Sequence, residues 1–140
     1  MKCIGIIGGL GPESTIEYYK KIISLANEKW EYKKPEIVIY SFDEGTFTEL
    51  VEFNKDYDKL KGLLADTIEK LYRAGADFCL LAVNTGHIFF TDLESDSPIP
   101  LLSISDATAE KAKDIGMKKV GLLGTKMTVD GGFYQKSFEE

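Results

Sequence analysis

The polar residues most able to do chemistry stand where an apolar run ends. Residues 78–83 are apolar, and Asn84, Thr85 and His87, the only histidine of the chain, follow them closely. Asparagine and threonine can donate hydrogen bonds to a bound anion. An imidazole can orient a loop, contact a ligand or act as a base near neutral pH, and of these we favour the loop-orienting role for His87. Asn84 and Thr85 can equally cap a turn, so both roles stay open.

These residues need a sheet to position them. An unbroken apolar run at 78–83 predicts a parallel strand covered on both faces. Similar short runs predict strands at 3–8, 36–40, 99–104 and 119–124. Because helical patterns separate the strands, the sequence predicts one α/β domain with a doubly wound parallel sheet of about five strands in the order 2-1-3-4-5. The carboxyl ends of such strands form the edge where ligands bind.

The helices are expected between these strands. Pro12 opens the first, and apolar residues spaced along 60–71 predict a long second helix that Gly75 ends. One or two helical turns are expected within 86–93. Ser105 or Asp106 is expected to cap the next helix, which runs to Gly116. The sequence further predicts a polar loop at 125–128 and a final helix within 129–140.

A glycine-rich turn follows the first predicted strand. Gly8-Gly9-Leu10-Gly11-Pro12 leads into the first helix, and Glu13 suits its amino end. Free backbone N–H groups in such a turn can hold an anion. A dinucleotide-binding fingerprint needs a third glycine where Ser14 stands, so the turn does not favour that function.

The composition and net charge of the chain limit the classes of molecule that it is expected to bind. The 140 residues carry a net charge of −6 with no lysine- or arginine-rich face, which argues against nucleic acid and anionic membrane. No apolar stretch approaches the ~20 residues of a spanning helix, and the amino end is too short and glycine-rich for a signal peptide. Cys3 and Cys79 lie in apolar runs, as reduced core thiols of a cytoplasmic protein do. No metal-ligand spacing is present, so we expect a small ligand or another protein chain as partner.

Three stretches together resemble a known family. Residues 4–15, Asn84-Thr85-Gly86-His87 and residues 120–128 are similar, in this order and at this spacing, to the first half of the aspartate/glutamate racemases, the pyridoxal-independent amino-acid racemases. The resemblance covers essentially the whole chain. It implies two α/β lobes facing across a cleft, with 1–104 as the first lobe and 105–140 as the beginning of an incomplete second. It also implies catalysis without a cofactor, by one thiol from each lobe on opposite faces of the substrate's α-carbon.

The sequence departs from the family pattern at both thiols. The first family cysteine directly precedes the Asn-Thr pair, and here that position is Val83, which has no titratable proton. The second belongs to a Cys-Thr-Glu-like segment in the latter half of a longer chain. Cys79 cannot easily replace Val83, because four strand residues place it ~13 Å back along the strand. The family's substrate-side arginine has no clear equivalent in 41–50, which argues against selectivity for an acidic side chain.

The resemblance also implies a set of substrate-binding residues at the cleft. They share a position in loops at strand ends and are Gly9, Gly11, Pro12, Ser41, Asn84, Thr85, Thr125 and Thr128. Val83 marks the site of the absent base, and His87 remains a possible catalytic group. We therefore expect an amino-acid racemase family protein that is inactive or altered, and the alternative is a non-catalytic module that binds a small carboxylate.

Two further expectations concern alternatives and assembly. A nucleotide-binding regulatory domain with the same strand order is disfavoured, because the chain has neither a P-loop lysine nor an acidic cluster at the end of the first strand.

The predicted strand at 119–124 lacks further strands beside it, and Phe133, Tyr134 and Phe138 add apolar surface. An unpaired apolar edge favours pairing with another chain, so we expect a homodimer.

Overall fold

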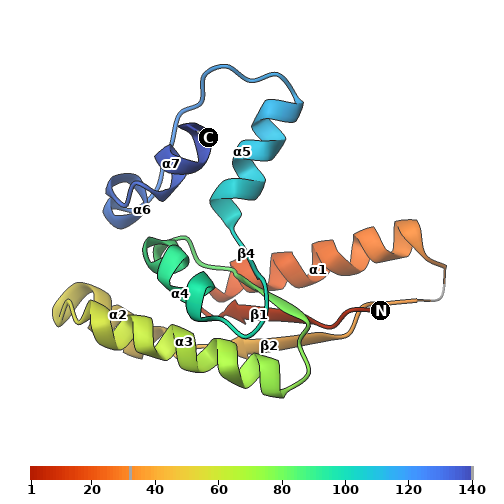
Figure 1. Cartoon of the computed structure of the whole chain (residues 1–140), viewed down its shortest axis with the longest axis horizontal. Coiled ribbons are helices and arrows are strands. Elements are labelled where there is room, and N and C mark those ends of the chain that lie inside the picture. Colours follow the sequence, from red (N-terminus) through yellow and green to blue (C-terminus); the bar gives the residue numbers. More distant parts are fainter. Residues whose placement is uncertain (32, 140) are drawn as a thin grey trace.

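The computed structural model describes residues 1–31 and 33–139 of the chain. Its centre is a parallel four-stranded sheet in the order β2-β1-β3-β4. The strands are β1 (Ile4–Gly8), β2 (Ile37–Ser41), β3 (Phe78–Leu81) and the short β4 (Leu101–Leu102). The predicted α/β class with a parallel, doubly wound sheet is confirmed, with the strand order 2-1-3-4 (Figure 1).

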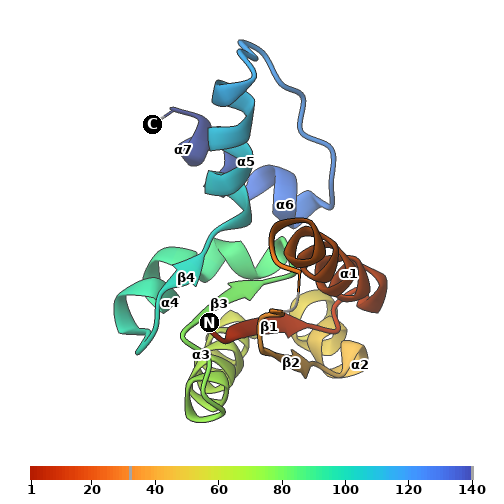
Figure 2. The ribbon, with the colours of Figure 1, turned by 90° about the vertical axis from the view of Figure 1, so that its right-hand side faces the viewer.

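Two long helices cover the two faces of this sheet. Alternate residues of a strand point to opposite faces. Ile6 accordingly packs in a cluster with residues of α1 (Pro12–Lys29), whereas Ile7 packs in a cluster with residues of α3 (Tyr57–Arg73). Figure 2 shows α1 and α3 on either side of the strands. Because both faces are covered, the central strands are apolar throughout, as the sequence predicted for 78–83.

Shorter helices fill the loops at the carboxyl ends of the strands. After β2 come α2 (Glu44–Thr48) and a π-helix, η1 (Glu49–Phe53), which continue directly into one another. After β3 come a 3-10 helix, η2 (Thr85–Phe89), and α4 (Phe90–Asp96), in agreement with the helical turns expected at 86–93. Asp43 caps α2, because its side chain accepts a hydrogen bond from the Thr46 N–H at 2.9 Å.

Residues 104–139 form a helical segment that stands beyond β4. It contains α5 (Ile104–Asp114), α6 (Lys126–Asp130) and α7 (Phe133–Glu139), and α5 packs against α7 (Figure 1). An extended stretch, residues 117–125, connects α5 to α6 (Figure 2). The predicted end of the last helix at Glu140 lies outside the described residues.

The structure corrects the predicted elements of this helical segment. Residues 119–124 form no strand, because no described strand lies beside them to complete a ladder, and the Leu123 side chain is 96% exposed. The strand predicted at 99–104 shortens to β4, since Ser103 rather than Ser105 or Asp106 caps α5 by accepting from the Asp106 N–H. The predicted polar loop at 125–128 begins α6 instead, with Thr125 as its N-cap.

Candidate functional site

The glycine turn after β1 lies directly against the end of β2. Gly9 has a φ of 86°, and a Cβ at this position would lie 2.6 Å from the backbone N of Phe42. The Gly9 N–H donates to the Thr15 hydroxyl at 2.9 Å, which ties the turn to α1. Gly9 therefore has to be glycine, both for its left-handed backbone and for the close approach of the two loops.

A cleft of about 710 Å³ opens at the carboxyl edge of the sheet. Four parts of the chain meet there: the glycine turn, the α2–η1 segment with the start of α3, the end of β3, and α6. Its lining residues are Leu10, Gly11, Glu44, Phe47, Thr48, Val51, Glu52, Lys55, Tyr57, Val83, Thr85, Thr125, Lys126, Met127 and Asp130. The position agrees with the general rule for open α/β sheets.

The cleft brings together four of the residues singled out in the sequence. Gly11, Val83, Thr85 and Thr125 all line it. Val83 is only 8% exposed and presents an apolar side chain at the end of β3. The hydroxyls of Thr85 and Thr125 are the side-chain groups among these four that can donate hydrogen bonds to a carboxylate. This part of the cleft can bind an anion, but Val83 cannot accept a proton from a ligand.

The other residues singled out in the sequence lie outside this lining. Gly9 lies in the glycine turn, Pro12 is the first residue of α1, and Ser41 is the exposed last residue of β2. Thr128 is buried, and its N–H donates to the Thr125 hydroxyl at 3.3 Å, so it serves the cap of α6.

Asn84 is held by a residue far along the chain. Its Oδ1 accepts a hydrogen bond of 2.8 Å from the hydroxyl of Tyr134 in α7. Burial raises the pKa of the Tyr134 phenol, so this hydroxyl stays protonated and remains a donor at neutral pH. The amide of Asn84 is therefore fixed from the side of α7.

His87 joins the sheet to the helical segment. It is 2% exposed, its Nδ1 lies 2.9 Å from the Val83 carbonyl oxygen, and its Nε2 accepts from the Ile104 N–H at 3.0 Å. Since a carbonyl can only accept, the proton must sit on Nδ1, and the ring is neutral. Burial lowers the pKa of His87, while the hydrogen bonds to the backbone and the charge of Asp106 oppose this shift. Both ring nitrogens are thus engaged by the backbone.

The two thiols are remote from the cleft lining. Cys79 is fully buried in β3, and burial raises its pKa to about 12. Cys3 is also buried, and its pKa is raised by burial and then by the carboxylates of Glu36 and Asp77. A thiolate is the reactive form of cysteine, so neither side chain can act as a base toward a ligand in the cleft.

Sequence reasoning missed the wall formed by α2 and η1. Its lining residues are Glu44, Phe47, Thr48, Val51 and Glu52, which are spaced three or four positions apart along one face, and Lys55 follows just after η1. That spacing is visible in the sequence and indicates one helical face. Local pattern alone does not say that this face turns toward a cleft. Tyr134 was singled out only as apolar surface, because its partner Asn84 lies 50 positions away.

The comparisons with known proteins agree on one family. The family model Asp/Glu/Hydantoin racemase matches residues 7–140. The chain belongs to the Asp/Glu/Hydantoin racemase family. The resemblance inferred from the three sequence stretches is thereby confirmed.

The chain is similar to proteins that are considerably longer. It is 29% identical over 137 residues to the broad specificity amino-acid racemase RacX of Bacillus subtilis, covering 95% of this chain and 59% of that protein. The structure of an aspartate racemase homologue from Pyrococcus horikoshii is 42% identical, with a TM-score of 0.84, over 99% of this chain and 61% of that one. The aspartate racemase of Picrophilus torridus is 28% identical, with a TM-score of 0.81 and coverage of 99% and 59%. The chain therefore spans about three fifths of the length of these relatives.

Two further observations concern membranes and metals. Across residues 1–31 and 33–139, none of the helices has the length and apolar character needed to cross a membrane. Within the same residues, no group of three or more histidine, cysteine, aspartate or glutamate side chains is arranged as a metal site.

Proposed function

We propose that this chain is an amino-acid racemase family protein that binds a small amino acid in the cleft without exchanging its α-proton. The observation that carries the proposal is that Val83 lines the cleft; by the family resemblance, this is the position that the first thiol would occupy. Thr85, Thr125 and the glycine turn supply the polar groups for a carboxylate. Residues 1–104 act as the first lobe and 105–140 as the start of a second, and no cofactor takes part.

A runner-up function uses the same cleft. In this alternative the chain is a non-catalytic module that retains a small carboxylate. The two functions share the family and the local chemistry, because both need the threonine hydroxyls and neither needs a base, and they differ in where the ligand's α-carbon lies. Restoring a thiol separates them, since only a racemase cleft places the ligand's α-carbon beside position 83.

Solvent-deuterium exchange at the α-carbon tests the proposal directly. We expect no exchange above background with aspartate, glutamate or neutral amino acids, because Val83 offers no base. The Val83→Cys variant should give slow exchange with retention at most, since one thiol serves only one face. Exchange by the unmodified chain that is lost in His87→Ala but not in Cys79→Ala would overturn the proposal and make His87 a base.

Measurements of ligand binding distinguish a ligand-binding role of the polar residues after β3 from a role in capping turns. We expect Thr85→Ala to weaken the binding of a small carboxylate more than it lowers the melting temperature, whereas Asn84→Ala, at a residue outside the cleft lining, should mainly lower the melting temperature. Each hydrogen bond lost to a charged ligand group should cost about 1.5–3 kcal/mol of binding free energy. Calorimetric titration and thermal unfolding of the same samples provide both quantities. Parallel losses in both would favour the capping role.

The proposal extends to assembly and location. The exposed apolar side chains of Val120 and Leu123 lie in an extended stretch beside which the described residues place no strand, which favours a two-fold homodimer formed through this stretch and α7. Sedimentation equilibrium at micromolar concentration would refute the dimer if it gave a monomer of 15.6 kDa. We place the protein in the cytoplasm, where its two free thiols remain reduced, and cell fractionation tests this location.

A further inference from the structure

One helical face forms the longest wall of the cleft. The α2–η1 segment turns Phe47 and Val51 toward the cleft, with Glu44 before them and Lys55 after them. Phe47 and Val51 are half-buried, whereas Glu44 and Lys55 are exposed. The middle of this wall is therefore apolar, and its charges lie at the rim.

Apolar side chains continue around the cleft from this wall. Leu10 comes from the glycine turn, Tyr57 from the start of α3, Val83 from the end of β3 and Met127 from α6. An aliphatic side chain lying against them would be removed from water on every side but the opening. Burial of apolar surface of this kind favours binding in proportion to the area covered.

The charged residues of the lining do not favour the side-chain carboxylate of an acidic ligand. On the α6 side, Lys126 pairs with Asp130. The remaining charged residues of the lining are Glu44, Glu52 and Lys55, which together carry an excess of one negative charge. A ligand with an acidic side chain would add another negative charge beside this wall, whereas an uncharged side chain would not.

Resting on the proposed function, we propose that the α2–η1 face is the side-chain subsite and that it selects amino acids with a large aliphatic side chain. Leucine and methionine are the ligands of this class. The ligand's side chain lies on Phe47 and Val51, while its α-carboxylate is held by the hydroxyls of Thr85 and Thr125. Aspartate and glutamate bind more weakly, because their side chains would lose water against the apolar Phe47 and Val51, and the rim charges of Glu44, Glu52 and Lys55 sum to a negative charge.

A binding panel on the 140-residue chain tests this selectivity. The probes are leucine, methionine, alanine, lysine and aspartate, each titrated by calorimetry or by backbone amide NMR shifts. We expect leucine and methionine to bind about tenfold more tightly than alanine or aspartate, which corresponds to 1.4 kcal/mol. Tightest binding of aspartate or of lysine would overturn the subsite and leave the proposed function standing. Absence of binding by every probe would reject the proposed function itself.

Two variants test the wall itself. Val51→Ala should lower the affinity for leucine several-fold and leave that for alanine unchanged, so the ratio of the two affinities reports the subsite independently of stability. Thr48→Arg places a cation on the same face and should raise the affinity for aspartate about tenfold.

A matched control places the same cation elsewhere on the same element. Phe53 belongs to η1 but is 77% exposed and lies outside the cleft lining. Phe53→Arg should leave all affinities unchanged. An equal gain of aspartate binding in Phe53→Arg and Thr48→Arg would show that net charge, and not the wall, sets the preference, and would overturn the proposal.

Discussion

The sheet region and the helical segment contain similar apolar residues, but these are buried in the first region and largely exposed in the second. In the sheet region, Ile7 and Leu64 are fully buried between β1 and α3. In the helical segment, Val120 and Leu123 are 46% and 96% exposed. Val120 lines a groove of about 700 Å³ between α5, α7 and the extended stretch. An apolar run therefore becomes a buried strand only where neighbouring strands and helices cover it.

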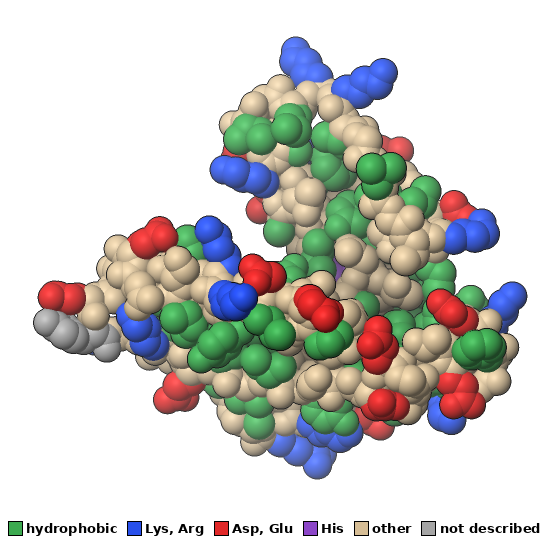
Figure 3. All heavy atoms as spheres, turned by 180° about the vertical axis from the view of Figure 1, so that it is seen from behind, with side chains coloured by type: hydrophobic (Ala, Val, Ile, Leu, Met, Phe, Trp, Pro, Cys, Tyr) green, Lys and Arg blue, Asp and Glu red, His purple; other side chains and the backbone are tan. Residues whose placement is uncertain are grey.

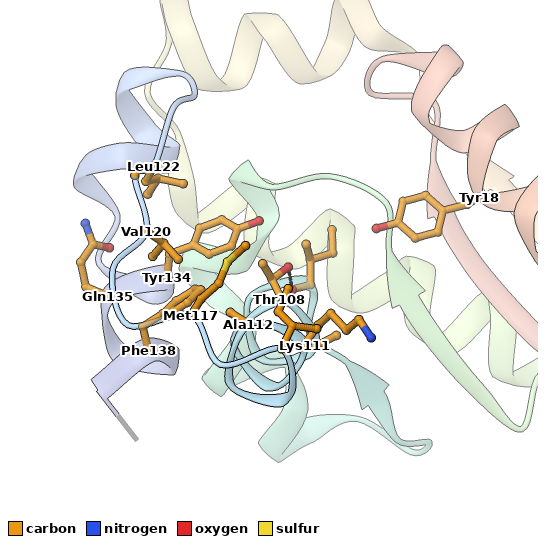
Figure 4. Close-up of a pocket in the computed structure, with 14 residues that line it drawn as sticks. Tyr18, Thr108, Lys111, Ala112, Met117, Val120, Leu122, Tyr134, Gln135 and Phe138 are labelled. Carbon is orange, nitrogen blue, oxygen red and sulfur yellow. Dashed lines mark hydrogen bonds between the residues drawn. The ribbon is translucent and has the colours of Figure 1, made fainter.

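The groove of the helical segment is lined by apolar side chains that no other part of the described chain covers. Met117, Val120 and Phe138 line it from the side of α7 and the extended stretch, and Tyr18 of α1 faces it from across the gap (Figure 4). The space-filling view shows hydrophobic side chains along the hollow between this segment and α1 (Figure 3). The sheet region should accordingly supply most of the folding free energy.

Core truncation gives the largest expected contrast between the regions. Leu64→Ala should lower the free energy of unfolding by about 2–5 kcal/mol, because it removes apolar contacts and leaves a cavity. Leu123→Ala deletes the same atoms from an exposed site and should change it by less than about 0.5 kcal/mol. Urea unfolding followed by circular dichroism measures both. Equal losses would show that the extended stretch is covered in solution.

The pH dependence of stability tests the connection through His87. Its pKa is lowered on folding from an ordinary value of 6.5, so the unfolded chain binds the proton more readily. The stability that the neutral His87 imidazole contributes is fully present above pH 6.5. It is lost as the pH falls toward the lowered pKa of the folded chain, by at most about 1.4 kcal/mol per pH unit.

A variant without the imidazole serves as the comparison for this pH effect. We expect His87→Gln to unfold more easily at every pH but with a flatter profile between about pH 5 and pH 7. Urea midpoints at several pH values give the two slopes. Parallel slopes in both proteins would mean that burial does not hold His87 neutral in the folded chain.

The contact between Tyr134 and Asn84 should have the smallest effect. Tyr134→Phe removes one hydrogen bond between α7 and the end of β3 and should cost about 1 kcal/mol. In an Asn84→Ala background the same change should cost little, and this double-mutant cycle isolates the pair. Tyr19→Phe in α1 is the control, since the described residues give Tyr19 no side-chain hydrogen bond and it is 46% exposed. Additive losses would contradict the coupling.

The sheet could be predicted from the sequence because its signals are local. The apolar runs of β1, β2 and β3 and the helical spacing of α3 are contained within short stretches. Residues 119–124 carry the same local signal, yet a strand also needs a partner, and that requirement cannot be seen in one stretch. The cap of α5 fell at Ser103 for a similar reason, since Ser103, Ser105 and Asp106 all suit a cap by type.

The cleft was predictable only in part. Gly11, Val83, Thr85 and Thr125 come together because parallel strands end at a common edge. The contacts of His87 with Ile104 and of Asn84 with Tyr134 span 17 and 50 positions. No spacing rule connects such distant residues, so the fixed orientation of both side chains became visible only in the fold.

Because both cysteines are buried, the folded chain should react slowly with thiol reagents, and this allows an introduced thiol to be followed alone. Neither Cys3 nor Cys79 offers an exposed thiolate, so an alkylating reagent should modify the folded protein slowly. A thiol introduced by Val83→Cys would be the fast-reacting group of the molecule. Its alkylation rate would then measure how open the cleft is, and slow modification at Cys79 would time the opening of the sheet.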